Sequence, residues 1–260
     1  MSSVVTRSAA RRRHLLARLS RAYTRFASPV AFVARRFVCS AAKVNGVARS
    51  AGRCLDVGAG TAPYRSDLNK MLGMIHYVAM DVAPSDTTQV VADGCRMPFS
   101  EGSFDMAVSF DVIQHVATPD QMLDEMVRVI SPGGHVLLTF PFLYPECDFY
   151  DFHRWTMDGM EQSLRACGLE IVLAERRGGR LFALACTLNW MMQHAIPGQR
   201  RSWRVARTWL GVARSILVVL LTLPTMLLAW AALAVDRVLP PGGLYMGGAI
   251  LARKPMREAA

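Results

Sequence analysis

The sequence predicts an α/β fold: a Rossmann-like, doubly wound sheet of seven strands that run mainly parallel. From residue 53 onward, short apolar segments alternate with helix-like segments and glycine-containing turns, the pattern of a parallel sheet covered by helices. Two apolar segments end in an aspartate, at Asp81 and Asp93. With 260 residues, 52% of them apolar, the chain can build one sizeable core and an additional segment. This composition excludes disorder as the dominant state.

The expected elements follow one another in order along the chain. Strands are expected at 54–57, 74–80, 89–92, 104–110, 135–140, 169–175 and 244–252, and helices at 61–72, 118–130 and 156–167. The second of these helices begins at Thr118, which forms a capping box with Gln121, and Pro119 takes its first position. The turn at 131–134 is expected to end this helix before the next strand.

An inserted element is expected before the last strand, because roughly seventy residues are too many for a hairpin loop. It contains an apolar segment at 181–196, five arginines between 200 and 214, and a segment at 215–235 of 21 residues without a charge. We therefore divide the chain into four parts. These are a basic amphipathic helical segment (1–44), a core (45–180), a hydrophobic helical insertion (181–242) and a final strand with its tail (243–260).

The net charge of +10 is distributed unevenly. The first 53 residues carry twelve Lys or Arg and no acid, residues 54–180 carry a net charge of −9, and residues 181–260 carry +7. Residues 7–27 have the pattern of a basic amphipathic helix, which fits a membrane-surface helix, a helix packed on the core, or a transit peptide. No nucleic-acid partner is expected, because the basic residues lie beside aliphatic segments without interleaved aromatic residues.

The six cysteines lie far apart, without a CxxC pair or a metal-ligand spacing. Neither a disulfide framework nor a metal site is therefore predicted, and a reducing compartment fits best.

Two glycines, Gly58 and Gly60, stand at the turn from the first strand into the first helix. The absent side chains allow a cofactor to lie against the backbone there. A dinucleotide-binding GxGxxG motif would need a third glycine at position 63, which is Pro63.

The order of motifs resembles the class I S-adenosylmethionine (SAM)-dependent methyltransferases, and within them the type 11 methyltransferase-domain family. The resemblance covers roughly residues 45–180 and the final strand. The matching segments are LDVGAGTAPY, YVAMD, ADGCRMPFSEGSFDMAVSFDVIQHV and RVISPGGHVLLTFP. It implies SAM as the cofactor and a last strand that lies antiparallel between the fifth and sixth strands. The N-terminal core and the C-terminal end would then lie on the same side of a membrane.

The resemblance also implies a role for each matched residue in the cofactor site. Asp81 would accept hydrogen bonds from both ribose hydroxyls of SAM, because a carboxylate at the carboxyl end of a strand faces the crevice. Asp93 and Gly94 would contact the adenine, and Phe110 would lie next to the transferred methyl group. The implied cofactor-binding residues are Asp56, Gly58, Ala59, Gly60, Asp81, Asp93, Gly94 and Phe110.

The acceptor side is less well defined by the sequence. His153, His115 and Tyr144 are the candidate catalytic residues. For His115 the alternative to a catalytic role is a structural role, in which the side chain packs under the cofactor. At the place of a histidine that often follows Tyr-Pro in the family, this chain has Glu146 and Cys147. For Asp151 and Arg154 an i, i+3 ion pair is preferred to substrate contact.

The segment 215–235 is long enough to span a membrane, which takes ~20 apolar residues. A single crossing conflicts with a last strand in the same sheet, and Pro224 offers a break for a shallow helical hairpin. A buried helix pair is the remaining alternative. We expect a methyltransferase at the cytoplasmic face of a membrane, bound to an anionic lipid surface and acting on a small or lipid-linked acceptor. A non-catalytic SAM-fold scaffold and a nucleotide-dependent oxidoreductase are the alternatives.

Overall fold

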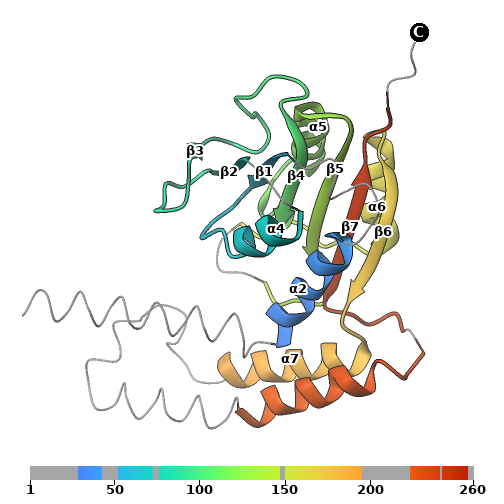
Figure 1. Cartoon of the computed structure of the whole chain (residues 1–260). Coiled ribbons are helices and arrows are strands. Elements are labelled where there is room, and N and C mark those ends of the chain that lie inside the picture. Colours follow the sequence, from blue (N-terminus) through green and yellow to red (C-terminus); the bar gives the residue numbers. More distant parts are fainter. Residues whose placement is uncertain are drawn as a thin grey trace, which may run out of the picture.

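A single seven-stranded sheet forms the centre of the protein (Figure 1). The structure is a computed structural model that describes residues 29–42, 52–72, 76–146, 150–194, 223–240 and 242–256. The strands are β1 (Arg53–Val57), β2 (His76–Asp81), β3 (Val90–Val91), β4 (Phe104–Phe110), β5 (Ile130–Pro141), β6 (Glu170–Arg177) and β7 (Gly247–Arg253). Their order is β3-β2-β1-β4-β5-β7-β6, and only β7 runs antiparallel to its neighbours. The predicted fold class and the place of the last strand are confirmed.

Helices cover both faces of this sheet. They are α2 (Pro29–Ala42), α4 (Arg65–Leu72), α5 (Pro119–Val129) and α6 (Met157–Ala166). The chain also forms α7 (Arg180–His194) and a short 3₁₀ turn, η1 (Ile113–His115). Met122 of α5 and Met160 of α6 are buried in one core with β4 and β5. Phe37 of α2 and Leu68 of α4 are buried in a second core on the opposite face. Each helix buries one apolar face, as expected of amphipathic helices beside a sheet.

Three local predictions were wrong. The first core helix starts at Arg65 rather than at residue 61, because Ala62 has φ +48°, which a right-handed helix cannot contain. The capping box does not form, since the Thr118 hydroxyl donates to the Gln121 side chain (3.1 Å) instead of accepting from the backbone. The turn at 131–134 lies inside β5, where the Gly133 N–H donates to the carbonyl of the residue after β7.

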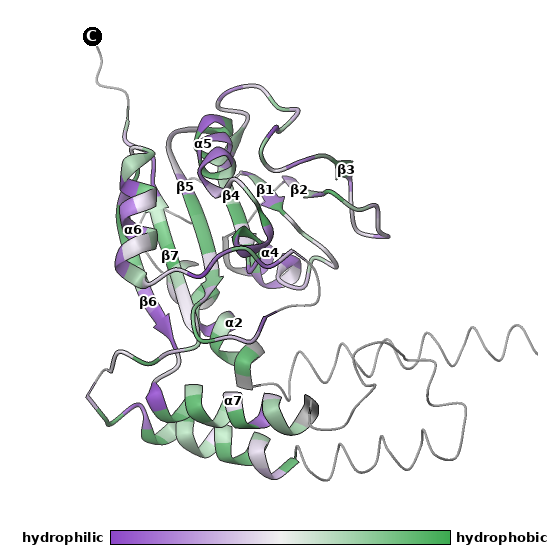
Figure 2. Ribbon diagram, turned by 180° about the vertical axis from the view of Figure 1, so that it is seen from behind, coloured by the Kyte–Doolittle hydropathy of each residue, from purple (hydrophilic) through white to green (hydrophobic). Residues whose placement is uncertain are grey.

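A separate layer of two helices packs below the sheet, at its carboxyl-terminal edge (Figures 1 and 2). α7 lies beside the helix formed by residues 223–235, and the two run antiparallel. Asp236 accepts hydrogen bonds from the backbone of Phe182 (2.8 Å) at the start of α7, and Thr225 donates to Asn189 (2.7 Å) further along. The predicted helix at 7–27, the arginines between 200 and 214 and the first part of the apolar segment 215–235, up to residue 222, lie outside the described residues. Within the described ranges, we find no helix that has both the length and the apolarity to span a membrane.

Candidate active site

The glycine turn after β1 gives its two glycines different roles. Gly58 has φ +72°, and a Cβ there would lie 2.5 Å from the methyl carbons of Val112, so packing alone requires a glycine. Gly60 has φ +51°, but a Cβ there would meet nothing within 4 Å. The chain therefore leaves open space above Gly60, as a bound cofactor requires. Ala59 between them is buried.

Asp81, the last residue of β2, lies directly beside this turn. Its Oδ2 accepts from the Gly60 N–H (2.9 Å) and its Oδ1 from the Ala83 N–H (3.0 Å). The Thr87 hydroxyl donates to the Gly60 carbonyl (2.6 Å) and holds the turn from the other side. Because a carboxylate offers about four lone-pair sites, Asp81 can still accept two more hydrogen bonds. This arrangement fits a ribose with two adjacent hydroxyls.

The other predicted cofactor residues lie at the same edge of the sheet. Asp93 is exposed, and its Oδ1 accepts from the Cys95 N–H (2.9 Å). A Cβ at Gly94 would lie 3.3 Å from Val57, so the chain approaches β1 closely there. Phe110, the last residue of β4, packs its ring against that of Tyr64, with centroids 4.4 Å apart.

Asp56 is placed differently from the other acids, because its side chain points into the protein. It is buried under the turn and accepts a hydrogen bond from the Tyr77 hydroxyl. Burial raises the pKa of its carboxyl to about 7, the nearby Asp81 adds to the increase, and the Tyr77 hydrogen bond opposes it. The Asp56 side chain thus links β1 to Tyr77 of β2 inside the protein.

A cavity of about 240 Å³ lies next to these residues, between the carboxyl-terminal edge of the sheet and the helix layer. α2, α7 and the loops after β4 and β5 form its wall, together with the end of β6. The lining residues are Val30, Val33, Asp111, Gln114, His115, Pro141, Tyr144, Arg177, Phe182 and Met246. Half of these residues carry polar groups, but most of the exposed lining surface is apolar, as in small-molecule sites.

Asp111 and Arg177 form the charged pair of this cavity. The two terminal nitrogens of Arg177 donate to the two carboxylate oxygens of Asp111 (2.8 and 2.6 Å), and one of them also donates to the Phe140 carbonyl (2.7 Å). Asp111 has φ +55°, which is unusual for a residue with a side chain. Sequence reasoning missed both residues. Asp111 directly follows the predicted strand 104–110, as Asp81 follows the predicted strand 74–80, and this position is the one sequence signal that could have identified it.

Of the three predicted catalytic residues, two line the cavity. His115 contacts the Tyr150 carbonyl through Nδ1 (2.8 Å) and Gln114 Nε2 through its own Nε2 (3.0 Å). Tyr144 forms another part of the wall. His153 is not part of the lining, and its Nε2 lies 3.5 Å from the Ala117 carbonyl.

The predicted ion pair between Arg154 and Asp151 is present, with Arg154 Nη2 2.6 Å from Asp151 Oδ2. Burial raises the pKa of the Cys95 thiol, as expected for an unreactive cysteine. Cys147 lies outside the described residues. In the part of the chain that the structure describes, no group of His, Cys, Asp or Glu could hold a metal ion.

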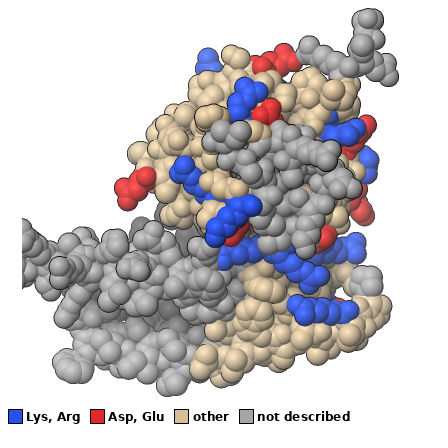
Figure 3. All heavy atoms as spheres, in the orientation of Figure 1, with Lys and Arg blue, Asp and Glu red and all other residues tan. Residues whose placement is uncertain are grey.

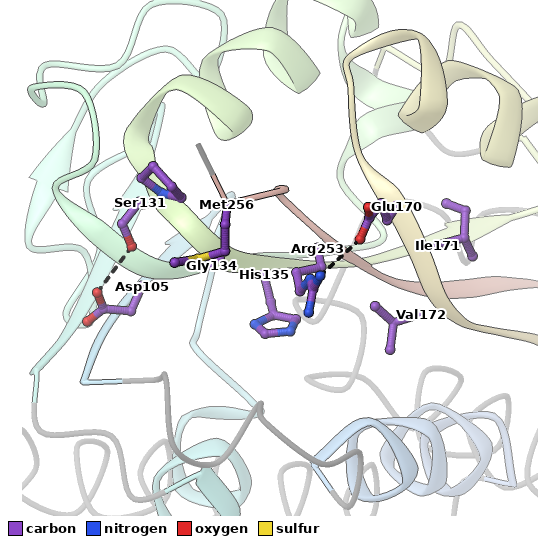
Figure 4. Close-up of a pocket in the computed structure, with 11 residues that line it drawn as sticks. Asp105, Ser131, Gly134, His135, Glu170, Ile171, Val172, Arg253 and Met256 are labelled. Atoms are coloured by element: carbon purple, nitrogen blue, oxygen red, sulfur yellow. Dashed lines mark hydrogen bonds and ion pairs between the residues drawn. The ribbon is translucent and has the colours of Figure 1, made fainter. Parts of the chain in front are cut away.

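A larger pocket of about 660 Å³ lies at the opposite edge of the sheet (Figure 4). The starts of β4, β5 and β6 surround it, with His135 beneath and the Glu170–Arg253 ion pair (3.2 Å) at one side. Ligands of doubly wound sheets bind outside the carboxyl ends of the strands. Its position therefore separates this pocket from the cofactor site, despite its size.

The comparison with protein families agrees with the geometry of the carboxyl-terminal edge. Residues 55–138, which include the glycine turn, Asp81, Asp93 and Phe110, match the family model described as "Methyltransferase domain". The chain carries a class I SAM-dependent methyltransferase domain. The predicted family is confirmed.

Named relatives match the methyltransferase domain over part of their length. An "uncharacterized methyltransferase" of Mycolicibacterium gilvum is 33% identical over 98 residues, 33% of this chain and 38% of the relative. Another, of Mycobacterium avium, is 38% identical over 68 residues, 26% of this chain and 27% of the relative. The chain thus spans less than two fifths of the length of these curated relatives.

Solved structures show the same fold around the methyltransferase domain. A putative sarcosine dimethylglycine methyltransferase from Galdieria sulphuraria superposes with a TM-score of 0.56 at 16% identity, covering 86% of each chain. The [4+2]-cyclase SpnF superposes with a TM-score of 0.55 at 19% identity, covering 87% of this chain and 81% of its own. At these identities the likeness concerns the fold alone.

Proposed function

We propose that this protein is an active SAM-dependent methyltransferase that works at the cytoplasmic face of a membrane, on a small or lipid-linked acceptor. The observation that carries the proposal is the position of the 240 Å³ cavity. On one side lies Asp111, which follows β4 and adjoins the glycine turn through Val112. On the other side lie Val33 of α2 and Phe182 of α7, which also pack in the helix layer. The cavity thus connects the cofactor edge with an apolar layer.

The residues of the carboxyl-terminal edge fit SAM. Asp81 retains acceptor capacity for ribose hydroxyls, and Gly60 leaves open space. Asp93 and Gly94 lie at the same edge of the sheet, and we assign them to the adenine. When bound, SAM supplies an electrophilic methyl group on a positively charged sulfur. The chain itself aligns the acceptor and excludes water, which is most of what an in-line methyl transfer requires of an enzyme.

The helix layer supports attachment to a membrane. α7 exposes apolar side chains at helical spacing, and Leu184 is 61% exposed. The neighbouring helix 223–235 adds Leu227, which is 60% exposed. Figure 2 shows that both helices consist largely of hydrophobic residues. We call their exposed apolar side chains together the helix face. Its exposed large side chains are Leu181, Leu184, Leu188, Met191, Leu223, Leu227, Leu228 and Val235.

Charge next to the helix face favours a lipid surface as its partner. Arg36, Arg176 and Arg237 line a cleft at the junction between the sheet and the helix layer, where arginines outnumber the acids Glu175 and Asp236. Figure 3 shows basic residues gathered along this junction, while the layer below is largely uncharged. Apolar side chains below a row of arginines suit anionic headgroups, which attract basic residues at the membrane surface. We therefore assign the helix face to an anionic bilayer.

Turnover of labelled SAM tests the activity. Purified full-length protein is incubated with methyl-labelled SAM and a membrane lipid extract, and the label is measured separately in the organic and aqueous phases. We expect label in the organic phase for a lipid-linked acceptor and in the aqueous phase for a small one. SAM binding without transfer in either phase would support the scaffold, and NAD binding in place of SAM would support an oxidoreductase.

Vesicle flotation tests the assignment of the helix face. The double variant Leu184→Glu/Leu227→Glu should bind anionic vesicles at least about tenfold more weakly than the wild type, since two exposed leucines lose their apolar contact with the bilayer. Met256→Glu is the matched control, because Met256 is 68% exposed at the opposite edge. Equal vesicle binding by all three proteins would contradict the assignment to a lipid surface. So would a stable wild-type dimer that the double variant no longer forms.

A further inference from the structure

The cavity beside Asp111 contains two buried polar side chains, each with one atom that has no hydrogen-bond partner among the described residues. Gln114 is 3% exposed and Arg177 is 7% exposed. The unpartnered atoms are Gln114 Oε1, which accepts hydrogen bonds, and Arg177 Nε, which donates them. Both residues line the same cavity. Buried polar groups are nearly always paired, so an exception in a cavity suggests that a ligand supplies the partner.

The neighbouring contacts fix the orientation of the Gln114 amide. Its nitrogen donates to the Asp111 carbonyl (2.6 Å) and lies 3.0 Å from His115 Nε2. His115 Nδ1 lies 2.8 Å from the Tyr150 carbonyl, which can only accept, so Nδ1 carries the proton and Nε2 accepts from Gln114. A flipped amide would place its oxygen against the Asp111 carbonyl. The unpartnered atom is therefore the oxygen, and the ligand must donate to it.

The charges of the cavity restrict the ligand further. The Asp111 carboxylate and the Arg177 guanidinium are paired through two hydrogen bonds, so neither is left to balance a charged ligand. A carboxylate has no proton for Gln114 Oε1. A neutral amine can donate to Gln114 Oε1, but an amine that also accepted from Arg177 Nε would have no lone pair left to receive a methyl group. A hydroxyl donates and accepts and keeps a second lone pair.

We propose that the protein recognises its methyl acceptor through a neutral hydroxyl group, which donates to Gln114 Oε1, and through an apolar body, which packs between Val33, Phe182 and Met246. This inference rests on the proposed methyltransferase function and names the class of its acceptor, a hydroxyl-bearing apolar molecule. The cavity of about 240 Å³ lies below the ~300 Å³ of common small-molecule sites. A lipid-linked acceptor would thus place one end in it. Gln114 is then a specificity-determining residue.

Binding of matched probes without SAM tests the inference, because no transfer can then occur. The probes are para-propylphenol, its methyl ether para-propylanisole, para-propylaniline and para-propylbenzoate, titrated against the full-length protein in one nonionic detergent. The phenol should bind at least about tenfold more tightly than the ether, because the ether leaves Gln114 Oε1 without a donor. Equal binding of phenol and ether, or a preference for the aniline or the benzoate, would overturn the proposal.

The variant Gln114→Met links the preference to this residue. It should bind phenol and ether equally and keep the SAM affinity of the wild type, whereas Gln162→Met, at an exposed position on α6, should keep the preference for phenol. A phenol preference that survives in Gln114→Met would overturn the assignment. If this variant does not fold, the wild-type comparison of phenol with ether still decides. If the wild type prefers the phenol but does not transfer a methyl group from SAM, only the proposed function is contradicted. If it methylates an amine or a carboxylate, only this inference is contradicted.

Discussion

Replacing Asp56 with asparagine should make the stability of the domain less dependent on pH. The Asp56 carboxyl is 2% exposed, and its burial raises its pKa from 3.8 to about 7. The folded protein therefore keeps this proton at a pH where the unfolded chain has released it. As the pH rises between these two values, folding is increasingly opposed, because the folded state must hold a proton that the unfolded state gives up.

The size of the effect follows from the shift in pKa. A change from 3.8 to about 7 corresponds to about 4 kcal/mol of unfolding free energy, which is fully present below about pH 4 and lost by about pH 7. Asparagine does not titrate, and its amide oxygen can still accept from the Tyr77 hydroxyl. Relative to the wild type, Asp56→Asn should thus gain stability as the pH rises and reach a constant difference above about pH 7.

Urea unfolding at several pH values between about 4.5 and 8 measures this difference, with both proteins in the same nonionic detergent. Asp86→Asn, the same exchange at an exposed loop position, controls for the change in net charge. The reasoning is refuted by a difference between Asp56→Asn and wild type that does not change with pH, or by one that Asp86→Asn reproduces.

Three further outcomes are expected. Asp81→Ala should weaken SAM binding by more than about tenfold without unfolding the domain, because charge-assisted hydrogen bonds to the ribose are lost; calorimetric titration checks this against Asp86→Ala. Gly58→Ala should lower the melting temperature more than Gly60→Ala, since a Cβ at Gly58 meets Val112 at 2.5 Å whereas one at Gly60 meets nothing; equal losses would contradict the assigned roles. The full-length protein should sediment with membranes and stay there at about 1 M salt, because salt screens arginine contacts and leaves apolar burial intact; release by salt alone would refute apolar attachment.

Local sequence pattern was sufficient to predict most of the fold. Apolar segments with glycine turns predicted all seven strands, and Phe104–Phe110 was predicted at its observed bounds. The start of the first core helix was predicted wrongly because it depends on a single backbone conformation, the positive φ of Ala62. An alanine in the sequence gives no sign of such a conformation. The closeness of Asp81 to the glycine turn was predictable for the same local reason, since the pattern places both at the carboxyl ends of strands.

Only the tertiary structure determined the cavity and its polar groups. Arg177 pairs with Asp111 across 66 positions of sequence, and they meet because the ends of β4 and β6 lie at the same edge of the sheet. Asp56 lies one residue before the end of its strand and was grouped with Asp81 in the sequence, yet its side chain points inward to Tyr77 on the neighbouring strand. Sequence periodicity specifies which residues form an element and which face is apolar. The partner of a polar atom depends on strand order and register, which arise when distant segments pack together.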